Sequence, residues 1–222
     1  KKIIEYQLQD ASSEPLVSLT AKDLTIETAS ESMAPGGGSI SAYVGALGTS
    51  LGTMVSNLSA NKPGWEDKLD YFSKWAEKGQ KIRKELLFLV DEDTRSFNGI
   101  IDAIRMPKDT ASDKKARIDA IEKASQYAAE VPYQVMEMAN KNCELLEEML
   151  KNGNAASITD AGVGALCTIC AIEGAYMNIR INTKDLSDKA FATSLNNKAE
   201  SLLNSSKSRL NKLIAEVHSA IS

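Results

Sequence analysis

The stretch MAPGGGSISAYVGALGTSLGTMVSNLSAN, residues Met33–Asn61, contains no charged residue, and it decides the fold. After the turn-forming sequence APGG at 34–37, large apolar residues recur every three or four positions, which is the period of an α-helix. These residues are Ile40, Val44, Leu47, Leu51, Met54 or Val55, and Leu58. We expect this stripe to face a hydrophobic core.

A second stripe of small residues lies one step round the same helix: Ser41, Gly45, Gly48, Gly52, Ser56 and Ser59. Small side chains let another helix backbone come close. A helix without charge on any side is expected to be buried on every side, at a subunit interface or in the centre of a bundle. A membrane span is not expected, because a span needs about 20 predominantly apolar residues and this stretch is rich in Gly, Ser and Thr.

Helical periodicity also governs the rest of the chain, and no run of alternating strand residues is present. A short helix capped by Thr20 is expected to reach about Ser30. Long helices are expected over 65–106, 112–151 and 158–182, and from the turn TKDLSD to about Ala220. Pro132 should kink the second of these long helices. The sequence therefore predicts an all-α fold: one domain over residues 1–222, a bundle of long antiparallel helices with one or two short helices, dimerising.

Composition narrows the classes of function. A chain of 222 residues that is 43% hydrophobic suits one sizeable globular domain. With 26 Lys and Arg against 30 Asp and Glu, and no long basic run, nucleic acid is not expected as a partner. Three cysteines and no expected secretory leader indicate a reducing compartment, and hence a cytoplasmic location.

Asp93 interrupts an apolar stripe of the 65–106 helix, whose members are Ile82, Leu86, Leu89, Phe97, Ile100 and Ile104. A carboxylate on a core face needs a partner or a shifted pKa, and burial alone raises a pKa by up to about 3–5 units. Such groups are often functional. A buried salt bridge to a Lys or Arg of another helix is an equally good explanation. The neighbouring Asp91 and Glu92 are expected to be solvated.

The 158–182 helix carries small residues along one face, with Asp160 at one end and the carboxamides of Asn178 and Asn182 at the other. Such a trough would receive a flat ligand with amide-like edges, because Asn both donates and accepts hydrogen bonds. The residues alone favour a plainer interpretation, in which Asp160 caps the helix and the small residues serve packing.

The sequence PGGGS opens the 38–59 helix, so the N–H groups of Gly36, Gly37, Gly38 and Ser39 are expected to attract an anion or a carbonyl oxygen. The motif matches neither a nucleotide P-loop nor a dinucleotide fingerprint, and a tight turn alone would explain it. Cys167-x-x-Cys170 has a metal-like spacing. With no second pair and His218 as the only histidine, no metal site is expected.

Four stretches in order resemble the cyclodeaminase/cyclohydrolase family of folate enzymes: PGGGSISAYVGALGTSLGTMVSNL, VDEDTRSFNGIIDAIRMPK, AAEVPYQV and DAGVGALCTICAIEGAYMNIRIN. This family includes formiminotetrahydrofolate cyclodeaminase and a bacterial methenyltetrahydrofolate cyclohydrolase. The similarity runs from about Leu19 to the end, which leaves residues 1–18 as an extension. The resemblance implies an all-helical subunit that dimerises, with the folate site in a cleft near the interface.

The resemblance also implies roles for particular residues. Asp93 would move protons or stabilise a cation, and Asp160, Asn178 and Asn182 would orient the pterin. The N–H groups of the 36–39 segment would contact a carbonyl or carboxylate. Lys62 or Arg180 would meet the glutamate tail, although the basic stretch that the family often has after SNL is reduced here to Lys62. No cofactor is expected beyond the tetrahydrofolate substrate.

The expected activity is conversion of 5-formiminotetrahydrofolate to 5,10-methenyltetrahydrofolate and ammonia, a step of histidine breakdown. The first alternative is a methenyltetrahydrofolate cyclohydrolase, which makes nearly the same demands on the protein. An alternative of another class is a non-catalytic helical interaction module, in which Asp93 and Asp160 are paired internally. A further one is a relative that keeps the fold and serves another small molecule.

Overall fold

The computed structural model describes residues 15–222, and in that part every regular element is a helix. The elements in chain order are η1 (Leu16–Ser18), α2 (Ala21–Thr28), α3 (Gly37–Ala60), η2 (Glu66–Lys68), α4 (Leu69–Arg105), α5 (Ala111–Asn152), η3 (Ala155–Ser157), α6 (Ile158–Thr183) and α7 (Lys189–Ala220). The predicted all-α fold is confirmed. Most of the proposed extension, residues 1–14, lies outside the described residues.

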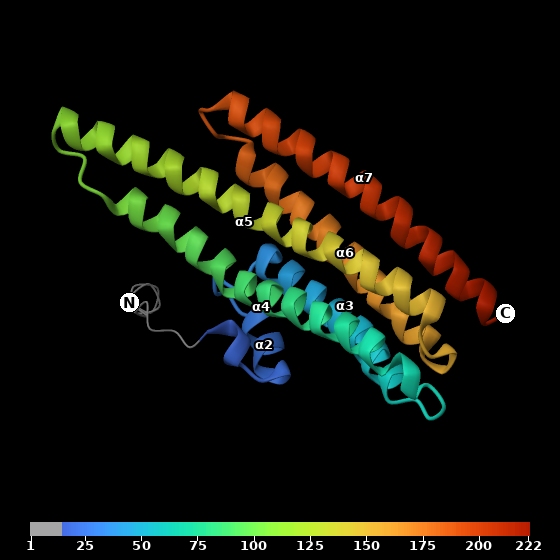
Figure 1. Ribbon diagram of the computed structural model, residues 1–222. Coiled ribbons are helices and arrows are strands. Elements are labelled where there is room, and N and C mark those ends of the chain that lie inside the picture. Colours follow the sequence, from blue (N-terminus) through green and yellow to red (C-terminus); the bar gives the residue numbers. More distant parts are fainter. Residues whose placement is uncertain (1–14) are drawn as a thin grey trace.

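The five long helices α3 to α7 run in alternating directions as a bundle (Figure 1). The first turn of α3 lies against the end of α6, where Gly37 meets Asn178, and Gly48 meets Gly164 further along. Helix α3 packs mainly on α4 and α6, while α6 also contacts α5 and α7. The α4–α5 hairpin extends past the start of α3 (Figure 1). The start of α3 is therefore held between α4 and α6, part-way along the bundle.

Most helix boundaries lie close to the predicted ones. Thr20 caps α2, its Oγ1 accepting the Asp23 N–H at 3.1 Å, as expected. Thr110 caps α5 through a reciprocal capping box with Asp113. Helix α4 begins at Leu69 rather than at Trp65, because Gly64 has φ of 83° and the short η2 turn follows it.

For α3, the prediction that the stripe of small residues lets another helix backbone come close is confirmed, and the prediction that the stripe of large residues faces the core was wrong. Of the 14 buried residues of α3, all but Val55 are Gly, Ala, Ser or Thr. The large residues Leu47, Met54 and Leu58 are exposed by 45%, 37% and 46%. The cause is steric: α3 lies so close to α6 that a Cβ at Gly48 would stand 2.8 Å from the Gly164 carbonyl oxygen. Small residues fill the crowded side, and the large ones face out of the subunit.

Helix α5 continues through Pro132, which cannot donate the usual bond to the carbonyl of Ala128. Asn182 on α6 fills this gap, since its Nδ2 donates to the Ala128 carbonyl at 2.7 Å. A side chain of one helix thus supplies the hydrogen bond that proline removes from another.

The stretch Ala155–Thr183, which contains α6, is the one part of residues 15–222 long and apolar enough to cross a membrane by length and composition. Its most apolar window has a mean hydropathy of 1.6 and is 44% buried within the subunit. The same stretch packs against α3, α5 and α7, as a central helix of a bundle does. That no membrane is a partner stays a prediction.

Candidate active site

Asp93 of α4 reaches the first turn of α3. One of its oxygens, Oδ2, accepts the backbone N–H of Ser39 at 2.8 Å and the Ser39 hydroxyl at 3.0 Å. Ser39 is completely buried, and Asp93 is half-buried. Within residues 15–222 no Lys or Arg forms a salt bridge with Asp93, so the buried ion pair considered above is not found there. The partners of the carboxylate are the hydrogen-bond donors of a helix N-terminus.

Burial raises the pKa of Asp93 above the ordinary aspartate value, and the two hydrogen bonds from Ser39 lower it. Burial is the larger effect, so the net direction is upward. An aspartate with a raised pKa gives up and takes back a proton nearer to neutral pH. Such a group suits general acid–base chemistry.

Gly38 makes room for this carboxylate. A Cβ at Gly38 would stand 2.1 Å from Asp93 Oδ1 and 2.6 Å from Cγ, whereas a Cβ at Gly36 would meet nothing within 4 Å. Gly64 is the one glycine with positive φ among residues 15–222. Gly38 is therefore required for space and not for an unusual backbone conformation.

Asn178 brings a third helix to the same place. A Cβ at Gly37 would stand 3.2 Å from Asn178 Nδ2, which donates to the Gly174 carbonyl at 2.8 Å. Gly36 and Gly37 are exposed. The N–H groups of Gly37 and Gly38 find no acceptor among the described residues, as is usual in the first turn of a helix. The fold thus gathers Asp93, Ser39, the glycine turn and Asn178.

The remaining predicted site residues lie elsewhere in the subunit. Asp160 is on the same helix as Asn178 but 18 residues earlier, a separation of about 27 Å along α6. Lys62 follows the far end of α3, where its Nζ lies 4.1 Å from the centre of the Trp65 ring. Asn182 is engaged with the Ala128 carbonyl of α5.

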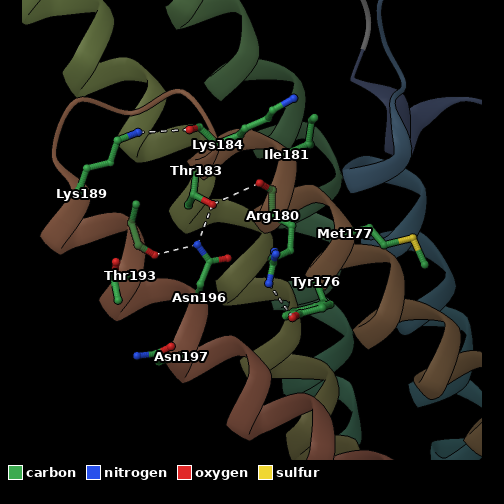
Figure 2. A pocket seen from close by; sticks show the side chains of 11 residues that line it. Tyr176, Met177, Arg180, Ile181, Thr183, Lys184, Lys189, Thr193, Asn196 and Asn197 are labelled. Atoms are coloured by element: carbon green, nitrogen blue, oxygen red, sulfur yellow. Dashed lines mark hydrogen bonds between the residues drawn. The ribbon is translucent and has the colours of Figure 1, made fainter.

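Arg180 points toward α7 (Figure 2). Its Nη1 donates to the Tyr176 hydroxyl at 3.3 Å, beside a crevice between α6 and α7. Sequence reasoning did not single out this crevice, since its lining comes from two helices that no spacing rule connects.

Two neighbours of Asp93 make contacts that the sequence did not predict. Asp91, predicted to be solvated, is half-buried, and its Oδ1 accepts the backbone N–H of Leu16 at 2.7 Å. Thr94 places its hydroxyl 3.4 Å from that of Ser39. Neither contact has a signal in the sequence, because each depends on how a distant segment crosses α4.

Among residues 15–222, no three His, Cys, Asp or Glu side chains gather in a way that could hold a metal ion. The three cysteines are free, and Cys143 is fully buried. The chemistry available at the start of α3 is therefore that of a carboxyl group, a hydroxyl group, a carboxamide and backbone N–H groups.

Known proteins resemble the chain over most of its length. It is 30% identical over 210 residues to the mouse formimidoyltransferase-cyclodeaminase, which covers 94% of this chain and 39% of the relative. It is 33% identical over 184 residues to the methenyltetrahydrofolate cyclohydrolase of Methylorubrum extorquens, covering 81% of this chain and 88% of the relative. The crystal structure of a Thermotoga maritima formiminotetrahydrofolate cyclodeaminase has the same fold, with a TM-score of 0.77, 23% identity, and coverage of 91% of this chain and 98% of that one.

The chain spans about two fifths of the length of the mouse relative. The family model for formiminotransferase-cyclodeaminase matches residues 20–201, most of the chain. The related proteins are cyclodeaminases and cyclohydrolases that act in folate one-carbon chemistry. The chain therefore belongs to the formiminotransferase-cyclodeaminase family of folate one-carbon enzymes.

Proposed function

We propose that the chain is a formiminotetrahydrofolate cyclodeaminase, which converts 5-formiminotetrahydrofolate to 5,10-methenyltetrahydrofolate and ammonia. The observation that carries this proposal is the half-buried carboxyl of Asp93, held through one oxygen by Ser39 beside the exposed Gly36 and Gly37. Burial raises its pKa, as a proton carrier requires. In this proposal the enzyme is an ammonia-lyase of histidine breakdown in the cytoplasm.

The proposed reaction needs one proton to travel from one nitrogen to another. N10 of the substrate attacks the carbon of the protonated formimino group on N5, and a C–N bond closes a five-membered ring. Asp93 takes the proton from N10 and gives it to the amino nitrogen on the same carbon. The bond from that carbon to the amino nitrogen then breaks, ammonia leaves with the electron pair, and the methenyl cation remains. No atom changes oxidation state overall, so the proposal includes no cofactor beyond the substrate.

The surroundings of Asp93 would position the substrate. Asn178 offers a carboxamide to the pterin edge, and the N–H groups of Gly37 and Gly38 are available to a carbonyl or carboxylate. Holding N10 against the formimino carbon would supply a large part of the rate, because well-oriented intramolecular reactions gain about 7–11 kcal/mol. The carboxylate would also stabilise the developing cation.

A homodimer is part of the proposal. Helices α3 and α6 turn a continuous apolar face out of the subunit, and its exposed members are Leu47, Met54, Leu58, Val163, Leu166, Cys170, Met177 and Ile181. We assign this face to a second copy of the chain, since its exposed members are apolar and uncharged, as in the core of a subunit interface. In an antiparallel two-fold arrangement, Asp160 and Lys62 of one subunit approach Asp93 of its partner.

The cyclohydrolase is the second candidate, favoured by the similarity to the Methylorubrum extorquens enzyme over 88% of that protein's length. In that reaction water attacks the methenyl carbon, and Asp93 would take a proton from the water and release it to solvent. The bond from that carbon to N5 then breaks, N5 takes the hydroxyl proton, and the formyl group stays on N10. The same site serves both reactions, so the choice between them depends on the leaving nitrogen.

A spectrophotometric assay tests the proposal, because the methenyl product absorbs in the near ultraviolet. The purified chain is given 5-formiminotetrahydrofolate in one experiment and 5,10-methenyltetrahydrofolate in the other. Rising absorbance with release of ammonia in the first supports the cyclodeaminase. A fall in absorbance above the spontaneous rate in the second alone identifies the cyclohydrolase. If neither changes and calorimetry detects no folate binding, the chain is a helical interaction module and the proposal is wrong.

A further inference from the structure

A cavity of about 600 Å³ lies between α5 and the start of α7. Its lining comes from α5 and from the N-cap and first turns of α7, so it does not involve the outward face of α3 and α6 that we assign to a second subunit. Small-molecule sites have volumes of about 300–1,000 Å³, and this cavity is within that range. None of its lining residues takes part in the reaction proposed above, so the cavity is separate from the candidate active site.

Hydrogen bonds at two levels fix how α5 and α7 lie against each other. The two helices run in the same direction (Figure 1). Glu122 of α5 accepts the backbone N–H of Asp188 at 3.0 Å, and the Ser206 hydroxyl of α7 donates to Asn140 Oδ1 at 2.8 Å. In both pairs the later residue is 66 positions after its partner. Between these two levels, a residue of α7 therefore stands beside the α5 residue 66 positions earlier.

Two opposite charges on the two helices line the cavity without forming an ion pair. By this register Lys198 is level with position 132, which is two residues, or about 3 Å along the helix axis, past Glu130. Within residues 15–222 no salt bridge involves either side chain. Asp188, the other acid of the lining, is already engaged, since its carboxylate caps α7 by accepting the Phe191 N–H at 2.9 Å. Glu130 and Lys198 are therefore available to a ligand that carries both charges.

Two aromatic rings give the cavity an apolar surface. Tyr133 and Phe191 line it, are half-buried, and pack on the hydrophobic core. Aromatic rings pack against other rings, and their faces also attract ammonium groups. Gln134 and Ser194 add a carboxamide and a hydroxyl to the lining. The cavity thus combines an anion, a cation and a ring-lined surface.

We infer that this cavity binds a free α-amino acid with an aromatic side chain, its ammonium group at Glu130, its carboxylate at Lys198, and its ring against Tyr133 and Phe191. The two charged groups of an α-amino acid are bonded to the same carbon, so one small molecule can join two charges that stand nearly level on neighbouring helices. A plain amine would leave Lys198 unpaired, and a plain carboxylate would leave Glu130 unpaired. The inference goes beyond the proposed function and does not depend on it.

Calorimetry on the full chain tests which groups of the ligand matter. The probe is L-phenylalanine, and the comparisons are 2-phenylethylamine, which lacks the carboxylate, 3-phenylpropanoate, which lacks the ammonium group, and L-alanine, which lacks the ring. We expect phenylalanine to bind at least about tenfold more tightly than 2-phenylethylamine or 3-phenylpropanoate, the effect of losing a charge-assisted hydrogen bond. Alanine should also bind more weakly, because it buries no ring. Absence of phenylalanine binding, or equal binding of all four compounds, would overturn the inference.

Two variants assign the two charges to their residues. Glu130→Gln should weaken phenylalanine binding at least about tenfold and leave 3-phenylpropanoate binding unchanged, whereas Lys198→Gln should weaken phenylalanine equally and spare 2-phenylethylamine. General unfolding would not produce this crossed pattern. Glu200→Gln and Lys212→Gln, both exposed on α7 outside the cavity, are the matched controls and should bind phenylalanine like the wild type. Wild-type binding by Glu130→Gln would show that the amino acid does not occupy this cavity.

Competition separates the cavity from the candidate active site. Phenylalanine binding measured with and without saturating 5-formyltetrahydrofolate should be the same, because the cavity shares no lining residue with the start of α3. Displacement of phenylalanine by the folate would place it at the active site, and the inference would be wrong. If the chain turns over no folate substrate, the proposed function fails, while the ligand series and the two variants still decide whether the cavity is a site.

Discussion

Helices α3 and α6 meet through small residues along their whole contact, and the two ends of this contact differ in what fills the space that the small residues leave. At the first turn of α3, Gly38 makes room for the carboxyl of Asp93. Further along, Gly48 makes room for the backbone of α6, whose Gly164 oxygen would stand 2.8 Å from an added Cβ. At the far end, the carboxyl group of Asp160 has no hydrogen bond or ion pair within residues 15–222. Identical small residues thus seat a reactive group at one end and serve packing along the rest.

Among the substitutions that test this difference, Asp93→Asn should have the largest effect on activity. Removing a general acid–base group lowers kcat by roughly 10²–10⁴-fold. The pKa of Asp93 is raised in the folded state, so the ionised carboxylate destabilises the fold relative to the protonated carboxyl. The stability that the protonated group contributes is present at low pH and is lost as pH rises through the folded-state pKa. The asparagine variant is therefore expected to be at least as stable as the wild type near neutral pH, which thermal unfolding would show. Wild-type turnover would remove Asp93 from the mechanism.

Asp160→Asn tests whether the two ends belong to one site. In the proposed dimer this variant also loses activity, and mixing it with Asp93→Asn restores up to about a quarter of the wild-type rate, because half of the dimers are mixed and each holds one intact site. Full activity of Asp160→Asn alone would leave the far end with a packing role only.

Leu166→Glu is expected to break the dimer. Leu166 is 55% exposed on the outer face of α6, and a two-fold interface would bring the new charges into an apolar contact, at a cost of several kcal/mol. Light scattering should show a monomer, with loss of activity if Asp160 acts across the interface. Ala215→Glu, exposed on α7, places the same charge elsewhere and should leave the assembly unchanged.

Gly38→Ala separates the two uses of glycine. The added Cβ displaces the Asp93 carboxyl and its bonds to Ser39, so kcat should fall by about tenfold or more, comparable to losing a charge-assisted hydrogen bond. Gly36→Ala, with nothing within 4 Å, should behave like the wild type in the same assay. Gly48→Ala should instead lower stability by about 1–3 kcal/mol through overpacking. If Gly38→Ala were more active than Gly48→Ala at an equal folded fraction, Gly38 would not be the glycine that serves the active site.

Ser39→Ala should shift the pH dependence. The Ser39 hydroxyl lowers the pKa of Asp93, so its removal raises that pKa further, while the backbone N–H bond remains. The acidic limb of the kcat/KM profile is expected to move to higher pH. An unchanged limb would show that the titrating group is not Asp93.

Asn182→Ala should have the smallest effect, a loss of about 1–3 kcal/mol in the free energy of unfolding, because the Ala128 carbonyl is left without a donor. In a Pro132→Ala background, the backbone N–H of residue 132 in α5 can donate to the Ala128 carbonyl. The loss of unfolding free energy caused by Asn182→Ala should then be smaller. Equal losses in both backgrounds, measured by chemical denaturation, would assign Asn182 another role. A large change in KM for folate would support the predicted contact with the pterin.

The sequence predicted the helices well, because each long helix carries its own period and its own stop signals. It also marked Asp93, which stands out as a charge on an apolar stripe. It did not reveal which side of α3 faces inward, since both stripes of that helix are uncharged and the choice depends on how close α6 lies. The Asn182–Ala128 contact joins residues 54 positions apart, and its partner is a backbone atom that every residue possesses.

The bond from Asn182 to Ala128 has a consequence for how relatives of this chain diverge. The proline at 132 and the hydrogen-bond donor at 182 depend on each other. With the proline but without the donor, the Ala128 carbonyl has no hydrogen-bond partner. Without the proline, the helix supplies its own N–H and the donor is no longer needed. We expect the two positions to change together during evolution. Relatives that replace the proline are expected to drift freely at the second position.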